Sequence, residues 1–553
     1  MIFINKLYQW LLVLHVPLLS HHNKEAEAMK ESSSLTTEKE IFKGHHRLNS
    51  FQSRTISKKI GSDIVGDEEW ARFGTSISLS SDGKRLAIGT PMDDGTNQQY
   101  SSTGKVQVMD LKFGRWVQVG ADFYGYTDTD QLGASVSLSA DGHRLAIGAP
   151  TNSDVDLSTG NIRIYDLDED SSTWVQLGSK IDGEGRLDRF GTSVALSSDG
   201  DIVAAGAPKN DVDPGNNIYD SGHVRVFKFN GDDWVQMGDD INGNFGVVCP
   251  EREIGGFAGT VIALSEDGLR LALNDDKVVR VFDYNGVSWV QVGEDIVQPY
   301  IDIGSLSISA DGNRLVVGNP GYRLSGNAGS INIYDFVDGT WKLAKSFFGV
   351  GEADRLGSSV SISGDGSSIF AGATTSSPYV DTPIGNGYVQ TYTFNNTDWS
   401  EKIKFIGDSQ GDLFGSSVAS NSDGETFAVG ATLFYSVGLV RVFQMGTDSC
   451  NDSPFTFKTK KPSGESIWRS CKWVATKSTN WRCQNFEGVS TMCPSTCGLC
   501  SDCVDSTSRM KFYKTPDATK KITRDCDWTA TKSGARCEIE GMEDSCRKTC
   551  TNC

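Results

Sequence analysis

Seven copies of one short turn constrain the fold of this chain more than any other feature. Asp-Gly pairs in turns of the Ser-x-Asp-Gly kind stand at residues 82–83, 141–142, 199–200, 267–268, 311–312, 365–366 and 423–424. An alternating run precedes each turn, as at 135–139, and a small apolar run follows most of them, as at 144–150. Alternation beside a tight Asp-Gly turn predicts a β-hairpin.

Two further runs complete each unit. The third run follows a glycine, as at 160–166 and 222–227. The fourth opens with tryptophan in the stretches 116–120, 174–178, 234–238 and 289–293, with weaker copies at Trp341 and Trp399. Four strands per unit, with units 44 to 68 residues apart, are typical of the blades of a β-propeller.

The two ends of the repeat region complement each other. The seventh unit ends after 439–443 without a tryptophan strand, whereas 57–66 copies the stretch around 175–183 ahead of the first hairpin. We therefore expect the N-terminal strand to pair into the last blade, which closes the ring and removes exposed sheet edges. The prediction is an all-β, seven-bladed propeller over 55–447; six or eight blades would mean that one unit is misread.

The repeat resembles the FG-GAP repeat of integrin-type propellers. The resemblance is carried by Phe190-Gly191, by the run Gly-Ala-Pro at 206–208 and by the third strand at 222–226, with matching copies in other units. Calcium-binding members of that family carry an Asp-rich loop between the first two strands. Here the Ser-x-Asp-Gly turn keeps one Asp in most copies, too few oxygen ligands for a cation that takes six to eight.

Charge narrows the classes of partner. The chain has 553 residues and a formal net charge of -19. Nucleic acid and anionic membrane surfaces require a basic footprint, so the sequence predicts neither as a partner. Cations, basic proteins and neutral sugars remain, and we expect an extracellular protein or glycan as ligand.

The varied loops between the second and third strands and between blades are expected to share one face, where propellers place binding residues. They are acidic and aromatic, and the expected ligand face contains Tyr124, Tyr126, Asp128 and Asp130. Charged loops that simply stay solvated are the alternative. For calcium, the candidate ligands are Asp154, Asp156, Asp211 and Asp213.

The search for a catalytic motif favours a binding protein over an enzyme. No nucleophile elbow, zinc-protease helix or phosphate loop is present. His143 occupies a turn position, and His223 opens a third strand without Cys or His neighbours at ligand spacing. The alternative is an extracellular carbohydrate-active enzyme that uses a carboxylate pair.

Cysteines divide the chain sharply. Twelve of the thirteen lie between Cys450 and Cys553, which indicates a disulfide framework made in an oxidising compartment. They form two sets of six that both end in Cys-x3-Cys-x2-Cys, so 448–500 and 501–553 are predicted to be two duplicated modules. Fifteen pairings are open for each module. The remaining Cys249 is either a buried thiol or a link to another molecule.

The two modules resemble the ShKT domain, notably in the run Cys-Pro-Ser-Thr-Cys-Gly-Leu-Cys at 493–500. The toxin members use a Lys-Tyr pair between the third and fourth cysteines, which neither module has, so channel block is not expected. The pairing that the resemblance implies is Cys450–Cys500, Cys471–Cys493, Cys483–Cys497, Cys503–Cys553, Cys526–Cys546 and Cys537–Cys550.

The N-terminus agrees with an extracellular location. An apolar run over 7–19 after Lys6 predicts a signal peptide over 1–28, cleaved near 20–28, or alternatively a retained anchor. No later segment is apolar enough to span a membrane, and 29–54 has the composition of a disordered linker. Asn395 and Asn451 fit the N-glycosylation rule. The sequence thus predicts a secreted or cell-surface adhesion protein.

Overall fold

A computed structural model describes residues 56–95, 101–211, 218–244, 248–249, 252–254, 256–298, 303–321, 328–351, 353–375 and 385–446, and four short strands beyond residue 456. The predicted signal peptide and linker lie outside the described residues. In the described part, strands dominate and the helical element is the 3-10 turn Phe434–Ser436 (η3). No described helix is long and apolar enough to cross a membrane.

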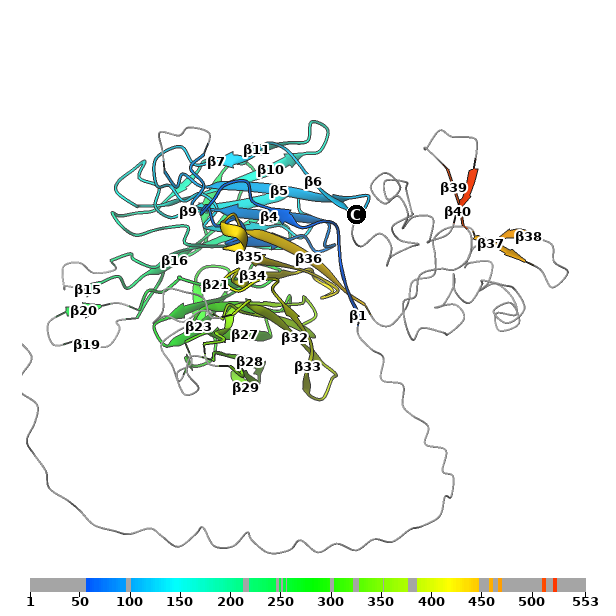
Figure 1. The fold of residues 1–553 in the computed structure, drawn as a ribbon. Helices are drawn as coiled ribbons and strands as arrows, with labels where there is room; N and C mark the ends of the chain where they lie inside the picture. Colours follow the sequence, from blue (N-terminus) through cyan, green and yellow to red (C-terminus); the bar gives the residue numbers. More distant parts are fainter. Residues whose placement is uncertain are drawn as a thin grey trace, which may run out of the picture. The chain divides into compact units, whose positions relative to one another are not determined.

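Most of the described strands form seven antiparallel sheets, which we number as blades 1 to 7 in chain order (Figure 1). Blade 1 contains β3 (Ser76–Leu79), β4 (Arg85–Thr90), β5 (Lys105–Lys112), β6 (Arg115–Gln118) and β7 (Phe123–Tyr124). Blade 2 contains β8 (Ser135–Leu138), β9 (Arg144–Ala149), β10 (Asn161–Asp168), β11 (Thr173–Gln176) and β12 (Ile181–Asp182). Blade 3 contains β13 (Ser193–Leu196), β14 (Ile202–Ala207), β16 (His223–Phe229), β17 (Trp234–Gln236) and β18 (Ile241–Asn242).

The remaining blades repeat this order. Blade 4 contains β21 (Ile262–Leu264), β22 (Arg270–Asp275), β23 (Val278–Tyr284), β24 (Trp289–Gln291) and β25 (Ile296–Val297). Blade 5 contains β26 (Ser305–Ile308), β27 (Arg314–Asn319), β28 (Ser330–Val337) and β29 (Thr340–Phe348). Blade 6 contains β30 (Leu356–Ile362), β31 (Ser368–Ala373), β32 (Tyr388–Phe394) and β33 (Trp399–Ile406). Blade 7 contains β34 (Phe414–Ser420), β35 (Thr426–Ala431), β36 (Leu439–Gly446), β1 (Ile56–Lys59) and β2 (Ile64–Val65).

The N-terminal strand closes the ring, as predicted. β1 pairs antiparallel with β36, with Lys59 opposite Phe443, and β2 pairs with the start of the same strand. Between them, Arg441 donates to both carboxylate oxygens of Asp63 at 2.9 and 2.8 Å. The predicted seven blades and their closure are therefore confirmed.

The Ser-x-Asp-Gly turns are hydrogen-bonded internally. In the second copy, the Ser139 hydroxyl donates to Asp141 Oδ1 at 2.6 Å and the His143 amide donates to the same oxygen at 2.9 Å. The next residue, Arg144, reaches Asp166 on the third strand at 2.6 Å. The Asp of each turn thus acts as a turn acceptor, and in the seventh copy Asn421 replaces the serine.

Glycine backbones meet where neighbouring blades join. The Ser135 hydroxyl donates to Gly191 O of the next blade at 2.8 Å, and the Gly191 amide donates to Gly206 O within its own blade at 3.0 Å. A Cβ at Gly148 would overlap the carbonyl of Gly191, whose own φ of +87° suits glycine. The serine-to-glycine bond recurs at six of the seven junctions, made by Ser76, Ser135, Ser193, Ser305, Ser359 and Ser417.

Apolar side chains fill each junction. The described residues form seven hydrophobic clusters, and every cluster contains residues of two neighbouring blades. The fourth-strand tryptophans add a bond between blades. The Trp234 indole, for example, donates to Leu177 O of the preceding blade at 3.0 Å. The core of this fold is therefore a set of interblade layers.

Three small sheets lie outside the blades. β15 (Ile218–Tyr219), β20 (Arg252–Ile254) and β19 (Val248–Cys249) connect the second-to-third loop of blade 3 with the insert that follows the blade. In the C-terminal region, β37 (Phe457–Lys460) pairs with β38 (Ser466–Arg469), and β39 (Met510–Tyr513) pairs with β40 (Lys521–Arg524). The predicted disulfides of the two modules lie outside the described residues.

Gly148→Ala should destabilise the propeller by about 3 kcal/mol, because the new methyl group overlaps backbone that cannot move without separating two blades. Gly114→Ala is the control: its φ of +75° disfavours alanine, but the Cβ meets open space, so the change should cost about 1 kcal/mol. Thermal unfolding followed by circular dichroism measures both. Equal losses of Tm would contradict the role of the close approach.

Asp63→Asn should lower stability at pH 7 by about 1–2 kcal/mol, since it weakens a bidentate bond to Arg441 that closes the ring. Burial raises the pKa of Asp63, but hydrogen bonding and charge from Arg441 and Lys59 outweigh it and lower the pKa overall.

Because that pKa is lowered, the stabilisation is present above the unfolded-state pKa and is lost as pH falls through the folded-state pKa. The difference in Tm between Asp63→Asn and wild type should therefore shrink in acid. Asp338→Asn, at an exposed carboxylate, should match wild type throughout. A difference that is constant with pH would contradict the assignment.

Candidate functional site

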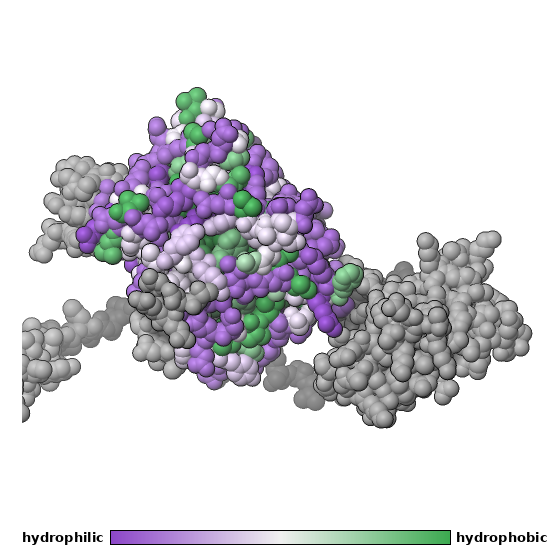
Figure 2. Space-filling model, turned by 90° about the horizontal axis from the view of Figure 1, so that it is seen from above, coloured by the Kyte–Doolittle hydropathy of each residue, from purple (hydrophilic) through white to green (hydrophobic). Residues whose placement is uncertain are grey.

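The strand order places two kinds of connection on opposite faces of the ring. The Ser-x-Asp-Gly turns and the third-to-fourth turns lie at one end of the strands, and the second-to-third loops and interblade connections lie at the other. We call the second end the loop face. In Figure 1 the sheet β15–β20–β19 projects from it at the left. The surface in view in Figure 2 is mostly hydrophilic, with separate apolar patches.

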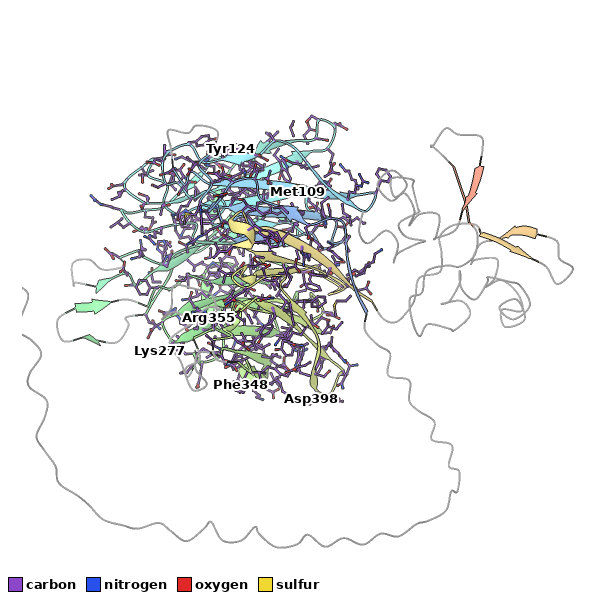
Figure 3. The ribbon with its side chains drawn as sticks, viewed as in Figure 1. Met109, Tyr124, Lys277, Phe348, Arg355 and Asp398 are labelled. Atoms are coloured by element: carbon purple, nitrogen blue, oxygen red, sulfur yellow. The ribbon has the colours of Figure 1, made fainter. Side chains whose placement is uncertain are left out.

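The predicted ligand-face residues lie together on the connection from blade 1 to blade 2. Tyr126 is 65% exposed, and the guanidinium carbon of Arg163 stands 4.1 Å from its ring centroid. Tyr124 lies in β7 and is half-buried (Figure 3). Asp128 is exposed and accepts from the amide and hydroxyl of Ser101. The structure thus brings these neighbours to one rim of the ring.

Asp130 has a different role from its predicted neighbours, because it is completely buried. Its carboxylate accepts from the amides of Tyr126 and Thr127 at 2.8 and 3.0 Å and from Asn152 Nδ2 at 3.0 Å. These bonds fold the connection back on itself and hold Tyr126 outward. Asp130 therefore holds this part of the loop face in place from beneath.

A groove of about 670 Å³ lies between blades 1 and 2 beside these tyrosines. Its aromatic wall is rigid, since Phe123 and Tyr165 pack with centroids 4.6 Å apart and the Trp174 indole donates to Val119 O at 3.2 Å. The groove is lined by Asp94, Thr103, Asp122, Phe123, Tyr124, Tyr126, Tyr165 and Trp174, among others.

Asp122 orients the polar side of this groove. Its carboxylate accepts from Gln107 Nε2 at 3.0 Å, from Gln118 Nε2 at 2.6 Å and from the Tyr124 hydroxyl at 3.1 Å. Burial and the charge of Asp122 raise the pKa of Tyr124 to about 12, so the phenol stays protonated at physiological pH. The groove therefore combines aromatic faces with fixed polar groups.

The predicted calcium ligands have protein partners where they are described. Asp154 pairs with Lys180 at 2.9 Å, a hydrogen bond that together with its charge lowers the pKa of Asp154 despite partial burial. Asp156 accepts from the Leu157 amide, and Asp211 accepts from the Asp220 amide at 2.8 Å. Asp213 lies outside the described residues. Calcium at these positions stays a prediction.

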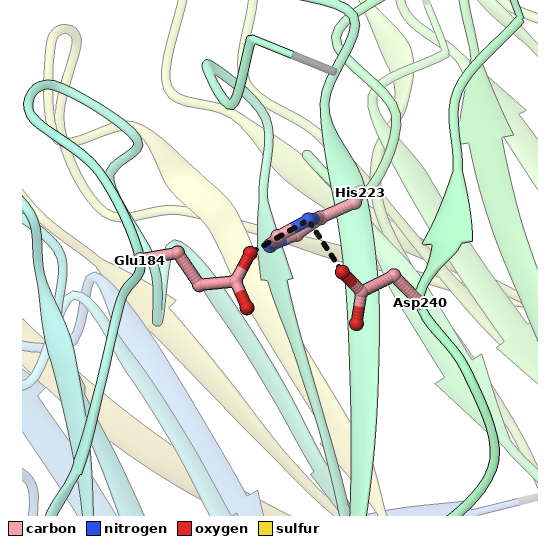
Figure 4. A group of neighbouring side chains, drawn as sticks. All are labelled: Glu184, His223 and Asp240. Atoms are coloured by element: carbon pink, nitrogen blue, oxygen red, sulfur yellow. Dashed lines mark ion pairs between the residues drawn. The ribbon is translucent and has the colours of Figure 1, made fainter. Parts of the chain in front are cut away.

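The structure assembles a cluster that sequence analysis missed, formed by Glu184, His223 and Asp240 (Figure 4). One ligand atom from each lies within 4.8 Å of the others, the one such group of three found among the described residues. Sequence spacing hides it, because Glu184 belongs to the connection after blade 2. One sequence feature could have indicated that Asp240 has a fixed orientation: Gln236 stands at the same distance before Asp240 as Gln118 stands before Asp122.

Asp130→Ala should destabilise the protein by about 2–4 kcal/mol and increase the mobility of the 121–131 connection, because it leaves buried amide donors without an acceptor. Asp128→Ala, two residues away and exposed, is the control and should change stability by less than about 0.5 kcal/mol. Thermal unfolding measures the first effect and amide hydrogen exchange the second. Unchanged exchange at Tyr126 in Asp130→Ala would contradict this role.

Comparison with known proteins assigns no family. No protein-family model matches the chain, and no curated protein matches it at a significant level. The functional conclusion therefore depends on the fold and on the geometry of the site.

Proposed function

We propose that this chain is a secreted or cell-surface binding protein that recognises a glycan or protein ligand through the loop face of its propeller. The observation that carries the proposal is the aromatic and acidic groove between blades 1 and 2. Ligand sites typically combine apolar and aromatic walls with a few placed polar groups. The groove has this composition, and its size falls within the usual range for such sites.

The chemistry of the groove matches ligands that carry no negative charge. Aromatic rings such as those of Tyr126 and Trp174 stack on the apolar face of a sugar, and carboxylates such as that of Asp94 accept from hydroxyls. The same groups attract a Lys or Arg side chain through cation–π contact and charge. The net charge of -19 supports a neutral or basic ligand.

The groove favours binding over catalysis. Asp122 already accepts three hydrogen bonds from Gln107, Gln118 and Tyr124, which makes it a fixed acceptor that orients neighbouring groups. A glycosidase requires a pair of carboxyl groups, one of which is free to protonate the leaving oxygen. The geometry therefore supports a recognition site more than a hydrolytic one.

We assign the blades to the FG-GAP type on the basis of their junctions. The FG part of the motif holds a buried aromatic residue or leucine, such as Phe190, followed by a glycine with positive φ. The glycine of the GAP part, such as Gly148, packs against that backbone. The packing of glycine backbones where two blades meet therefore explains why the motif contains these residues. Its recurrence around the ring supports the assignment.

We further propose that the C-terminal region is a pair of ShKT-like modules that attach the propeller to an extracellular partner. Each predicted module contains a hairpin of two four-residue strands, and each second strand ends two residues before an equivalent cysteine, Cys471 or Cys526. This parallel supports a duplication. Asn395 is exposed in the turn after β32, where a glycan has access; Asn451 lies outside the described residues.

Tyr126→Ala should weaken ligand binding at least tenfold, because it removes the most exposed ring of the groove while the fold stays intact. The probes are an array of neutral glycans and an array of Lys/Arg-rich peptides, tested with the oxidised full-length protein. Phe113→Ala is the control, since Phe113 is fully exposed in the β5–β6 turn on the opposite face.

If the wild type is retained on the glycan array and Tyr126→Ala is not, the protein has a lectin-like function. The same difference on the peptide array would identify a protein ligand. Binding that both variants keep would place recognition elsewhere. No retention of wild type on either array would overturn the proposal.

A further inference from the structure

One strand position holds a different type of side chain in every blade. This is the first residue of the third strand of each blade, and its occupants in chain order are Lys105, Asn161, His223, Val278, Ser330, Tyr388 and Leu439. Each stands where the strand leaves the loop face. In blade 3 this position holds His223, whose side chain is 1% exposed.

The His223 ring points toward two carboxylates without bonding to either (Figure 4). Its Nδ1 lies 3.8 Å from Asp240 Oδ2 and 4.0 Å from Glu184 Oε2, beyond hydrogen-bond distance. Its Nε2 is buried with no hydrogen-bond partner in the described part of the chain. The nitrogen that faces the acidic pair is Nδ1, not Nε2, and it belongs to a ring that is 1% exposed.

We propose that Glu184, His223 and Asp240 bind a divalent transition-metal ion of the zinc class at the junction of blades 2 and 3. His223 Nδ1 and one oxygen from each carboxylate supply three ligands, and water completes the coordination. Glu184 comes from the connection after β12, whereas His223 and Asp240 belong to blade 3. The ion would therefore join two blades.

The ligand geometry is close to that of a metal site. Zn²⁺ binds His nitrogen and carboxylate oxygen at about 2.0–2.2 Å, so tetrahedral ligands lie roughly 3.3 Å apart. The two separations from His223 Nδ1 need to contract by roughly 0.5–0.7 Å from 3.8 and 4.0 Å. The two carboxylate oxygens lie within 4.8 Å of each other and need to approach by at most about 1.5 Å. The Glu184 side chain is 47% exposed and has room to make that movement.

Asp240 is already oriented for this role. Gln236 donates to Asp240 Oδ1 at 2.7 Å, which leaves Oδ2 to face His223. Hydrogen bonds of this kind fix the direction of metal-binding carboxylates. The arrangement repeats in blade 4, where Gln291 donates to Asp295 Oδ1 at 2.8 Å, but there the histidine position is occupied by Val278.

Charge around the cluster favours a cation. Arg225 lies 3.5 Å from Glu184 Oε1, but its other terminal nitrogen donates to Asp182 O at 2.7 Å and its guanidinium stacks over Phe190 at 4.4 Å. Four carboxylates surround Arg225, and one of them, Asp182, pairs with Lys180 at 3.0 Å; the four are Glu184, Asp240, Asp188 and Asp182. Negative charge thus exceeds positive charge at this junction.

Calcium fits the cluster less well than zinc. Ca²⁺ takes six to eight oxygen ligands, whereas this cluster supplies one nitrogen and two carboxylates. Nitrogen and carboxylate together suit Zn²⁺ and its neighbours in the transition series. The proposal therefore concerns a different cation and different residues from the predicted calcium ligands.

Isothermal titration with Zn²⁺ tests the proposal on the full-length oxidised protein, with free thiols quantified so that reduced cysteines do not contribute. Glu184→Gln and Asp240→Asn keep the shape of exposed or half-exposed side chains and should each weaken Zn²⁺ binding at least tenfold. Asp295→Asn is the matched control, because it makes the same change beside Val278, and it should bind as wild type does.

Saturating Zn²⁺ should also raise the Tm of wild type and of Asp295→Asn, but not of Asp240→Asn, since the ion joins two blades. The proposal would be overturned if the wild type binds no equivalent of Zn²⁺. It would also be overturned if Glu184→Gln and Asp240→Asn both bind Zn²⁺ as tightly as wild type does. Tighter binding of Ca²⁺ than of Zn²⁺ at these residues would overturn the metal class. Loss of ligand binding by Tyr126→Ala is a separate measurement and does not depend on these outcomes.

Discussion

The close approach of two glycine backbones at six of the seven junctions of the described ring is the constraint on which the rest of the ring depends. Gly148 meets the carbonyl of Gly191, and the Ser135 hydroxyl closes the contact at 2.8 Å. A side chain at Gly148 would force the blades apart and would open the apolar layer between them. Only the junction of blades 4 and 5 departs from the serine-to-glycine bond in the described chain, with Val261 and Asn274 at the equivalent positions.

A rigid ring allows variation at the ends of its strands, where the backbone geometry is fixed and the side chain is free to change. The first position of the third strand is the main example, since His223 and Val278 occupy equivalent places in neighbouring blades. The residues around such a position can stay the same from blade to blade. Equivalent glutamines orient the carboxylates of Asp122 and Asp240. One scaffold thus presents an aromatic groove at one junction and an acidic, histidine-containing cluster at another.

The fold could be predicted because its signals are local and repeated. Each Ser-x-Asp-Gly turn is hydrogen-bonded within five residues, as from Ser139 to Arg144, so its pattern survives in every copy. Of the residues predicted for the ligand face, Tyr124 and Tyr126 line the groove, whereas Asp130 is buried. In the sequence Asp130 resembles its exposed neighbour Asp128. The contacts of its carboxylate in the fold, with the amides of Tyr126 and Thr127 and with Asn152 of blade 2, distinguish it.

The sequence by itself determined the number of blades, the closing strand and the face that carries the variable loops, because hairpin turns, strand alternation and glycines act on neighbouring residues. Only the tertiary structure decided which distant side chains meet. Glu184 and His223 come from different blades, and their separation of 4.0 Å depends on how the two sheets pack. Beyond the repeated glycine and serine positions, the side chains that meet between blades depend on the twist and stagger of whole sheets, which no local pattern in the chain encodes.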